Sequence, residues 1–529
     1  RNESVNPPIT RIAEISGKPE AEVRKVLVES GAGYEMPNGD FAPADVYLSG
    51  NVRAKLREAK AAVEAGNKAV QRNVDALQKV VPADIPYYKI ETQMGATWVP
   101  PSAYAEFVGH MLGIQDGIEV AFQSGAWKVD FPSAYNHRAE ANSGFGSVHV
   151  KFKRLVRAAI ANQTITVKGK DEDGREFVMD EETKEVNAKI ADMRLKFGEW
   201  LWSDPVRRTA LEAEYNEVRN AYADPKFDGS FLGFQGMALT LGRGPFNLRE
   251  HQVNAIWRGL VTRKSLNAHE VGTGKTFTMG GIAVESRRYG IAKKPMLFAH
   301  NANSKSVAHE IQMMYPAAKV LYVDNLSKEN LKTRMMQIAN DDWDVIVMPH
   351  SIIDRIGFKE ETLMAMAQEE LNDLQTSAEE AAAEDNVTIT DEMWEDEEEL
   401  NKLRSVTAKQ LVKQRLKILS TIHKLAQQAS KEDSVAFEDM GVDMLLVDEA
   451  HEFKKPPIAT KMKLKGLQTQ TSNRSIALMF LTKYVRANNN GANVHLFTGT
   501  PITNTMTEVF HMMRYMMQEE MKEVALADW

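Results

Sequence analysis

A glycine-rich loop near the middle of the chain has the residue types needed to hold a nucleotide phosphate. It reads Gly272-Thr273-Gly274-Lys275-Thr276 and follows a short apolar segment. Glycines lack the β-carbons that would keep backbone N–H groups away from phosphate oxygens, and the N-terminus of a following helix attracts anions. We expect Lys275 to neutralise the β- and γ-phosphates of ATP and Thr276 to ligate Mg²⁺, although His269 stands where the general motif has glycine.

An acidic pair follows another apolar run, at residues 444–447. The segment reads Asp448-Glu449-Ala450-His451. An aspartate at the end of a buried strand beside a phosphate-binding loop can hold Mg²⁺, and an adjacent glutamate can orient and deprotonate the attacking water. We therefore predict that Lys275, Asp448 and Glu449 are the catalytic residues of nucleoside triphosphate hydrolysis.

Small hydroxyl residues follow a third apolar run, at residues 494–497. This segment reads Thr498-Gly499-Thr500-Pro501. Hydroxyl groups at the end of that strand could sense the γ-phosphate through Asp448 and transmit its state to a neighbouring surface. The predicted coupling residues are His451, Thr498, Gly499 and Thr500.

The elements that must position these residues are predicted to form a parallel sheet. Six short apolar segments occur at residues 266–268, 296–299, 320–323, 345–348, 444–447 and 494–497. Helical segments separate several of them, and continuous apolar runs are typical of strands buried on both faces of a parallel sheet. In such doubly wound α/β folds ligands bind at the carboxyl ends of the strands, which is where the polar motifs lie.

Together these motifs resemble those of the DEAH-type helicases of superfamily two and, within it, the Swi/Snf-like DNA translocases. The resemblance covers about residues 248–517, and its most specific part is residues 498–504. It implies a RecA-like, P-loop ATPase lobe in residues 241–529 that uses ATP and Mg²⁺ and acts on double-stranded DNA. It also implies that Gln252 reads the adenine and that Asn303 and Ser351 contact DNA.

A looser resemblance connects the chain with very large phage and plasmid proteins. Residues 47–53, 224–236 and 437–455 are similar to parts of proteins that join an adenine methyltransferase to such a helicase, including antirestriction proteins of the DarB kind. The helicase family needs two RecA-like lobes, of which the second supplies an arginine and half of the DNA track. We therefore expect a second lobe, absent from this chain, and a methyltransferase domain or subunit in a longer protein or a partner.

The first 240 residues are predicted to form two accessory regions. Residues 1–116 have a mainly helical pattern, with two short helices and a hairpin at 9–41 that resemble a helix-turn-helix or a plain helical hairpin. Residues 117–240 have a mixed α and β pattern that includes a strand at 148–152. Basic residues alternate there with aromatic ones, as in a DNA-binding surface or in an amphipathic element with a basic side. These basic residues are Lys151, Lys153 and Arg154.

An insertion of about residues 360–437 interrupts the predicted motor lobe. It consists almost entirely of helix-forming residues, with an acidic run at 395–399 and a basic-apolar helix at about 409–428. Charge runs of this kind are usually solvated faces of helices. We expect an antiparallel helical protrusion.

Composition limits the location and chemistry of the protein. The 529 residues include no cysteine, which excludes disulfides, thiolate metal sites and cysteine nucleophiles and favours a reducing cytoplasm. The resemblance to phage and plasmid proteins implies that this is the cytoplasm of a bacterial host cell. Lys and Arg number 65 against 73 Asp and Glu, a net charge of −8, so DNA binding would need a local basic patch. No apolar stretch approaches the roughly 18 residues that a membrane span needs.

Two other functions fit the same motifs. Without a second lobe the chain could bind ATP and DNA, or a partner, as an architectural component that does not hydrolyse nucleotide. The letters of the DEAH motif also fit an RNA helicase, whereas residues 498–504 favour the DNA translocases.

Overall fold

The protein folds into two compact units that divide between Lys226 and Phe227. The computed structural model describes residues 8–36, 40–114, 116–123, 126–137, 146–170, 176–242, 244–324, 327–430, 434–459 and 470–523. The division lies before the predicted boundary at residue 240, because residues 227–236 pack on the second unit. The backbone N–H of Gly229 donates to Asn254 Oδ1 at 2.8 Å, and the Phe231 ring meets the edge of Trp257.

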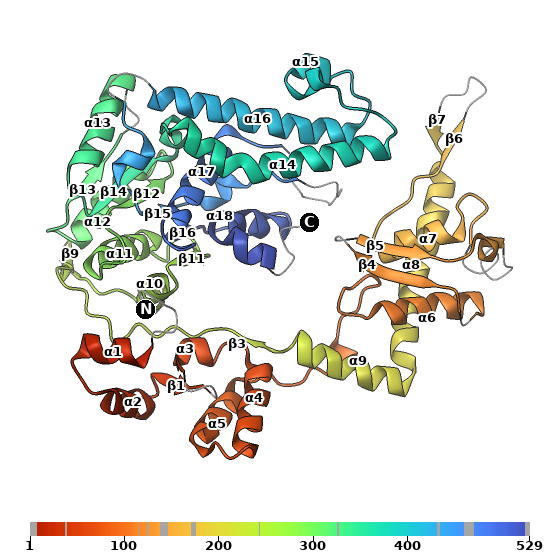
Figure 1. The fold of residues 1–529 in the computed structure, drawn as a ribbon, viewed down its shortest axis with the longest axis horizontal. Coiled ribbons are helices and arrows are strands. Elements are labelled where there is room, and N and C mark those ends of the chain that lie inside the picture. The colour runs from red at the N-terminus through yellow and green to blue at the C-terminus, as the bar shows by residue number, and fades with distance from the viewer. Residues whose placement is uncertain are drawn as a thin grey trace. The chain divides into compact units, whose positions relative to one another are not determined.

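A six-stranded parallel sheet forms the centre of the second unit (Figure 1). Its strands, in spatial order, are β11 (Lys264–Asn267), β16 (Val494–Phe497), β15 (Met444–Val447), β12 (Pro295–Ala299), β14 (Val345–Pro349) and β13 (Val320–Tyr322). All five pairings are parallel. The α/β fold with a RecA-like sheet is confirmed, and each of the six predicted strands is present.

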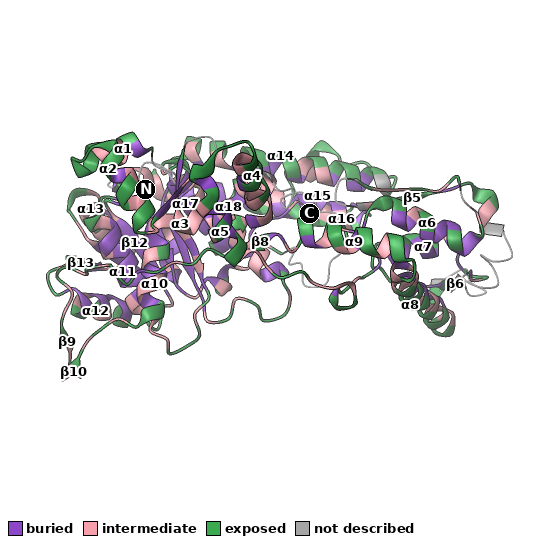
Figure 2. Ribbon diagram, turned by 90° about the horizontal axis from the view of Figure 1, so that it is seen from below, coloured by how far each residue is buried: buried purple, intermediate pink, exposed green. Residues whose placement is uncertain are grey.

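Helices cover both faces of this sheet because apolar side chains alternate between the two faces. Leu297 and Ala299 pack toward one face, against α10 (Glu250–Thr262), α11 (Lys275–Arg288) and α12 (Ser304–Met314). Met296 and Phe298 pack toward the other, against α13 (Lys328–Asn340), α17 (Asn473–Ala487) and α18 (Thr507–Glu523). The four central strands are buried along their whole length. Figure 2 shows the buried ribbon around β12 in purple.

The insertion is a helical hairpin between β14 and β15. Its long helices are α14 (Glu360–Glu384) and α16 (Val406–Ala429), with the short α15 (Glu397–Leu400) between them (Figure 1). The two long helices are antiparallel, since Phe358 before α14 donates its N–H to the Leu425 carbonyl near the end of α16. A buried ion pair between Glu370 and Lys483 fixes α14 to α17.

The first unit begins with two short helices and a two-stranded hairpin, and whether they form a helix-turn-helix or a plain helical hairpin stays a prediction. This part contains α1 (Ile9–Ser16), α2 (Glu20–Glu29) and the antiparallel hairpin of β1 (Gly33–Glu35) and β2 (Phe41–Pro43). The next elements are α3 (Ala44–Tyr47), β3 (Gly50–Asn51), α4 (Val52–Glu64) and α5 (Gln71–Val80). Tyr34 and Tyr47 stack at 5.2 Å and are buried in the core of this part.

The remainder of the first unit has a core of its own, which extends from Met94 to Leu211. This core crosses the predicted boundary between residues 116 and 117. Its elements are α6 (Pro101–Leu112), β4 (Glu119–Gln123), β5 (Ala126–Asp130), α7 (Phe152–Ile160), β6 (Lys168–Lys170), β7 (Glu176–Val178), α8 (Asp180–Ser203) and α9 (Pro205–Val218). The strand predicted at 148–152 is wrong, because Phe152 begins α7 and is buried there.

Candidate nucleotide-binding site

The three sequence motifs meet at one edge of the sheet because β11, β16 and β15 are neighbours. Leu266 is aligned with Leu496, and Leu496 is aligned with Val447. Since the strands are parallel, their carboxyl ends place the loop after β11, the acidic pair after β15 and the hydroxyl segment after β16 side by side.

The glycine-rich loop has a backbone that requires glycine. Gly272 and Gly274 have φ values of 86° and 81°, the left-handed region that other residues rarely adopt. Gly274 is the N-cap of α11, so the free N–H groups at the start of this helix face the loop. Lys275 Nζ donates to the His269 carbonyl at 3.4 Å, which holds the ammonium group inside the turn. Thr276 is partly exposed one residue further along α11.

Gln252 supports the glycine-rich loop from beneath. Its Nε2 donates to the carbonyls of Thr273 at 2.9 Å and Gly274 at 3.2 Å, and its Oε1 accepts the Arg249 N–H at 2.8 Å. The side chain is buried, and a β-carbon on Gly274 would lie 2.4 Å from its Nε2. Because both ends of the amide are already hydrogen-bonded, the recognition of adenine by Gln252 stays a prediction, and its role in shaping the loop was not foreseen.

Asp448 has the properties expected of a magnesium ligand. It is 7% exposed, and its Oδ1 has no hydrogen-bond partner among the described residues. Burial, and then the neighbouring charge of Glu449, raise its pKa to about 6. A buried carboxylate oxygen without a donor is costly in a folded protein. The donor set of Asp448 and the Thr276 hydroxyl therefore fits a hard cation with oxygen ligands.

Glu449, His451 and Thr498 connect the acidic pair with the hydroxyl segment. Glu449 has φ of 45°, an unusual backbone for a non-glycine residue, and its carboxylate lies 3.2 Å from His451 Nδ1. The same His451 Nδ1 lies 2.9 Å from Thr498 Oγ1. Thr498 is fully buried, and its Oγ1 also accepts the N–H of Thr500 at 3.1 Å. The structure thus brings together the predicted catalytic and coupling residues.

Gly499 lies directly against the glycine-rich loop. A β-carbon at this position would be 3.3 Å from Lys275 Nζ and 3.0 Å from Val271 Cγ2. Contacts of that length are tighter than ordinary van der Waals separations. A larger residue here would therefore require the side chains of Val271 and Lys275 to shift by a few tenths of an ångström, so the glycine allows the segment after β16 to lie close to the glycine-rich loop.

A network of two histidines and a glutamate, which the sequence analysis missed, lies behind Asp448. His350 Nε2 lies 3.0 Å from the Asp448 carbonyl oxygen, and His350 Nδ1 lies 3.2 Å from Glu452 Oε2. His300 Nε2 lies 3.5 Å from the other oxygen of Glu452. Burial lowers the pKa of His350, although Glu452 opposes this effect. The network joins the ends of β12, β14 and β15.

The predicted DNA contacts Asn303 and Ser351 lie on the loops after β12 and β14. Asn303 is exposed at the start of α12. Ser351 donates its N–H to Asn301 Oδ1 at 3.0 Å, and its buried hydroxyl has no partner among the described residues. Both residues therefore follow the carboxyl ends of their strands.

The three predicted basic residues lie at the start of α7 and not on the predicted strand: Lys151 is its N-cap, and Lys153 and Arg154 are in its first turn. Lys153 pairs with Asp130 and donates to the Phe131 carbonyl, so it supports β5. Lys151 and Arg154 are exposed, whereas Phe152 between them is buried and presents no ring for a base to stack on. Nucleic-acid binding by these three basic residues stays a prediction.

Two further features, a cluster of metal-ligating side chains and a membrane-spanning helix, are absent from the part of the chain that the structure describes. No group of three or more His, Cys, Asp and Glu side chains among the described residues could hold a metal ion. None of the helices formed by these residues is long and apolar enough to cross a membrane.

Comparisons with known proteins match both units of the chain. Residues 257–528, more than half of the chain, match a family model described as a probable helicase domain. Residues 93–221 match a model described as a domain of unknown function (DUF8437), and these residues correspond to the core between Met94 and Leu211. No curated protein matches the chain.

Proposed function

Because the chain belongs to the probable helicase domain family, we propose that residues 241–529 are an ATP-hydrolysing motor lobe that acts on double-stranded DNA. The observation that carries this proposal is the convergence of three motifs at one sheet edge. Their closest connection is the 2.9 Å contact between His451 and Thr498.

The residues of this edge have separate roles in the proposed reaction. Bound Mg²⁺·ATP supplies the scissile phosphoanhydride and the charge of the metal. The N–H groups of residues 272–276 bind phosphate oxygens, and Lys275 neutralises them. Thr276 and Asp448 hold the metal, and Glu449 accepts a proton from the attacking water. Because His451 touches both Glu449 and Thr498, it can connect the base with the segment after β16.

The finer parts of the proposal rest on the sequence resemblance. Residues 498–504 are similar to the corresponding segment of Swi/Snf-like translocases, which favours duplex DNA over RNA. That resemblance also implies a second RecA-like lobe, which supplies an arginine to the transition state. We propose that the motor belongs to a larger phage or plasmid protein, with a methyltransferase domain or partner, in the cytoplasm of a bacterial host.

The choice of nucleic acid can be tested through activation of ATP hydrolysis. The steady-state ATPase rate of the full-length protein is measured alone and with saturating duplex DNA, single-stranded DNA or single-stranded RNA. We expect the largest stimulation with duplex DNA. Stimulation by RNA alone would identify an RNA helicase, and ATP binding without turnover under all conditions would identify a non-hydrolysing component.

A further inference from the structure

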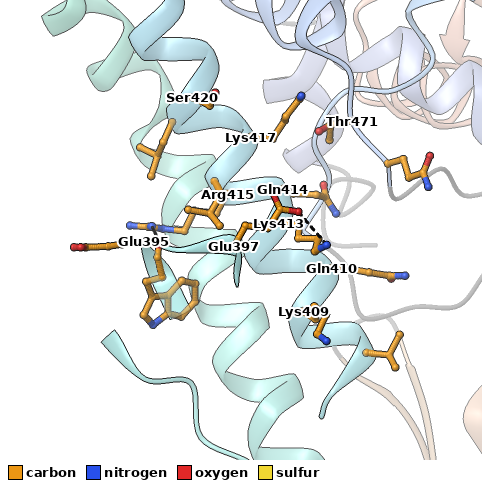
Figure 3. Close-up of a pocket in the computed structure, with 15 residues that line it drawn as sticks. Glu395, Glu397, Lys409, Gln410, Lys413, Gln414, Arg415, Lys417, Ser420 and Thr471 are labelled. Atoms are coloured by element: carbon orange, nitrogen blue, oxygen red, sulfur yellow. Dashed lines mark hydrogen bonds and ion pairs between the residues drawn. The ribbon is translucent and has the colours of Figure 1, made fainter. Parts of the chain in front are cut away.

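A polar groove runs along α16 in the helical insertion (Figure 3). It is lined by α16, by residues 394–397 before and within α15, and by Gln470 and Thr471. The groove has a volume of about 1140 Å³, which exceeds the usual 300–1000 Å³ of a small-molecule pocket. Its lining is rich in charged side chains, whereas small-molecule pockets are mostly apolar. The groove therefore fits a charged polymer better than a small ligand.

Three lysines form one face of this groove. Lys409, Lys413 and Lys417 are four residues apart, so they follow one another along the same side of α16. We call them the lysine face. Two of these lysines have local partners: Lys409 donates to the Asn401 carbonyl at 2.8 Å, and Lys413 pairs with Glu397 at 3.1 Å. Lys417 is exposed and has no ion-pair partner among the described acidic residues.

The opposite rim of the groove is fixed in place by Arg415. Its guanidinium group lies 5.3 Å from the centre of the Trp394 ring and donates to the Trp394 carbonyl at 3.5 Å. Glu395 lies on the side of this contact, whereas Glu397 lies beside Lys413 of the lysine face (Figure 3). Four cationic and two acidic side chains line the groove, so the lining itself carries more positive than negative charges although the chain has a net charge of −8.

The chain segment that follows the acidic pair Asp448-Glu449 is hydrogen-bonded to the helix that forms the groove. Ile458 lies a few residues beyond His451 and donates its N–H to Gln414 Oε1 at 2.9 Å. Gln414 is buried and lies between Lys413 and Arg415 on α16. The groove thus belongs to the same unit as the nucleotide site and is held at a fixed place in it.

We propose that the lysine face of α16 binds the phosphate backbone of the duplex DNA on which the motor acts. This inference rests on the proposed function and adds a contact outside the loops at the sheet edge. Three ammonium groups along a helix match a row of phosphates, and the exposed pair between Lys413 and Glu397 opens at little cost because water solvates both charges. Phosphate contacts of this type carry affinity without sequence preference.

The test measures how DNA affinity depends on salt in the full-length protein. Binding of a short random-sequence duplex is titrated without nucleotide over a series of salt concentrations. We expect the double variant Lys413→Gln/Lys417→Gln to have a slope of log K against log salt that is less steep by about 2, since each lost phosphate contact removes about 0.9. An unchanged slope would overturn the proposal and leave the lysine face free for another partner.

A matched control carries the same change of charge at the opposite edge of the sheet. Lys293 and Lys319 are exposed just before β12 and β13, away from the carboxyl ends of the strands. Lys293→Gln/Lys319→Gln should retain the wild-type slope. An equal loss of slope in this control would show a general charge effect and would contradict the proposal.

A third variant changes affinity in the other direction. Glu397→Gln removes the acid that pairs with Lys413, so DNA affinity at constant salt should rise about two- to fivefold, the value of an exposed ion pair. Weaker or equal binding would count against the lysine face. The outcomes also separate the two proposals. If the wild type neither binds DNA nor shows DNA-stimulated ATPase activity, the motor function is refuted. If the wild type does both and the double variant behaves like it, only DNA binding by the lysine face is refuted.

Discussion

His451 Nδ1 and Thr498 Oγ1 lie 2.9 Å apart although 47 residues separate them in the chain. Thr498 also donates its backbone N–H to the carbonyl of Asn267, the last residue of β11, at 3.1 Å. One threonine therefore connects the ends of β11, β15 and β16. This relationship makes Thr498 the best position at which to separate hydrolysis from its coupling to nucleic acid.

We predict that Thr498→Val uncouples the motor. The variant keeps the shape of the side chain but loses the hydroxyl that contacts His451. Basal ATPase activity should stay within a few fold of the wild type, whereas stimulation by duplex DNA should fall at least about tenfold, as expected for the loss of a positioned buried hydrogen bond. Thr498→Ser retains the hydroxyl and should retain stimulation, so equal behaviour of the two variants would refute this coupling role.

Asp448 predicts a pH dependence of nucleotide binding. Because burial and Glu449 raise its pKa to about 6, the free protein holds a proton on Asp448 below that pH, and binding Mg²⁺·ATP must release it. Calorimetric titrations in buffers of different ionisation enthalpy should detect this proton near pH 6. Asp448→Asn should abolish the release, and proton release that persists in the variant would assign it to another group.

The same raised pKa implies that Asp448 lowers the stability of the fold. Its pKa is higher in the folded than in the unfolded chain, so the protonated form favours folding, and stability falls as the pH rises from about 4 to about 6. Asp448→Asn should therefore raise the free energy of unfolding at neutral pH by about 1–3 kcal/mol. Chemical denaturation at two pH values measures this, and a destabilised variant at neutral pH would contradict it.

The close approach of Gln252 makes Gly274 sensitive to substitution. Gly274→Ala places a β-carbon 2.4 Å from Gln252 Nε2 in a backbone with φ of 81°. We expect at least about a tenfold loss of ATP affinity and a lower melting temperature, since the left-handed strain alone costs about 1–2 kcal/mol. Gly290→Ala has a similar φ of 70° with open space around it. This control should be destabilised by strain but should bind ATP normally, and equal ATP binding by the two variants would contradict the prediction.

The insertion should depend on the buried pair of Glu370 and Lys483. Burial raises the pKa of Glu370, but the opposing effects of Lys483 and Gln518 are together larger. The pKa is therefore below its ordinary value, and the carboxylate is charged in the fold. Lys483→Ala should cost about 3–5 kcal/mol because it leaves that charge unpaired, and the loss should diminish at acidic pH. Lys522→Ala breaks a more exposed pair between α18 and Glu369 of α14, and it should cost at most about 1 kcal/mol. Comparable losses in the two variants, measured by chemical denaturation, would refute the buried pair.

The sheet could be predicted from the sequence because its strands are fully apolar. The predicted segments at 296–299 and 444–447 differ from β12 and β15 by at most one residue. The strand predicted at 148–152 is wrong because the apolar pattern there is short and mixed, and Phe152 begins a helix instead. This residue lies in a short segment of alternating aromatic and basic residues, a pattern that fits the start of an amphipathic helix as well as a strand.

The site was predicted through its motifs, but the contacts between distant segments were not. In the network of His300, His350 and Glu452, the paired residues His350 and Glu452 are 102 positions apart in the chain. A single sequence contains no signal for such pairs. The burial of Gln252 beneath the loop was missed because its motif implied a contact with the base instead of the backbone.

The most direct test of the proposed function is ATP hydrolysis by Glu449→Gln in the full-length protein with and without duplex DNA. The variant keeps the size of the side chain but cannot accept a proton, so DNA-stimulated turnover should fall about 10²- to 10⁴-fold. Binding of a labelled ATP analogue should remain, whereas Lys275→Ala should lose both. DNA-stimulated hydrolysis that survives Glu449→Gln at the wild-type rate would contradict the account.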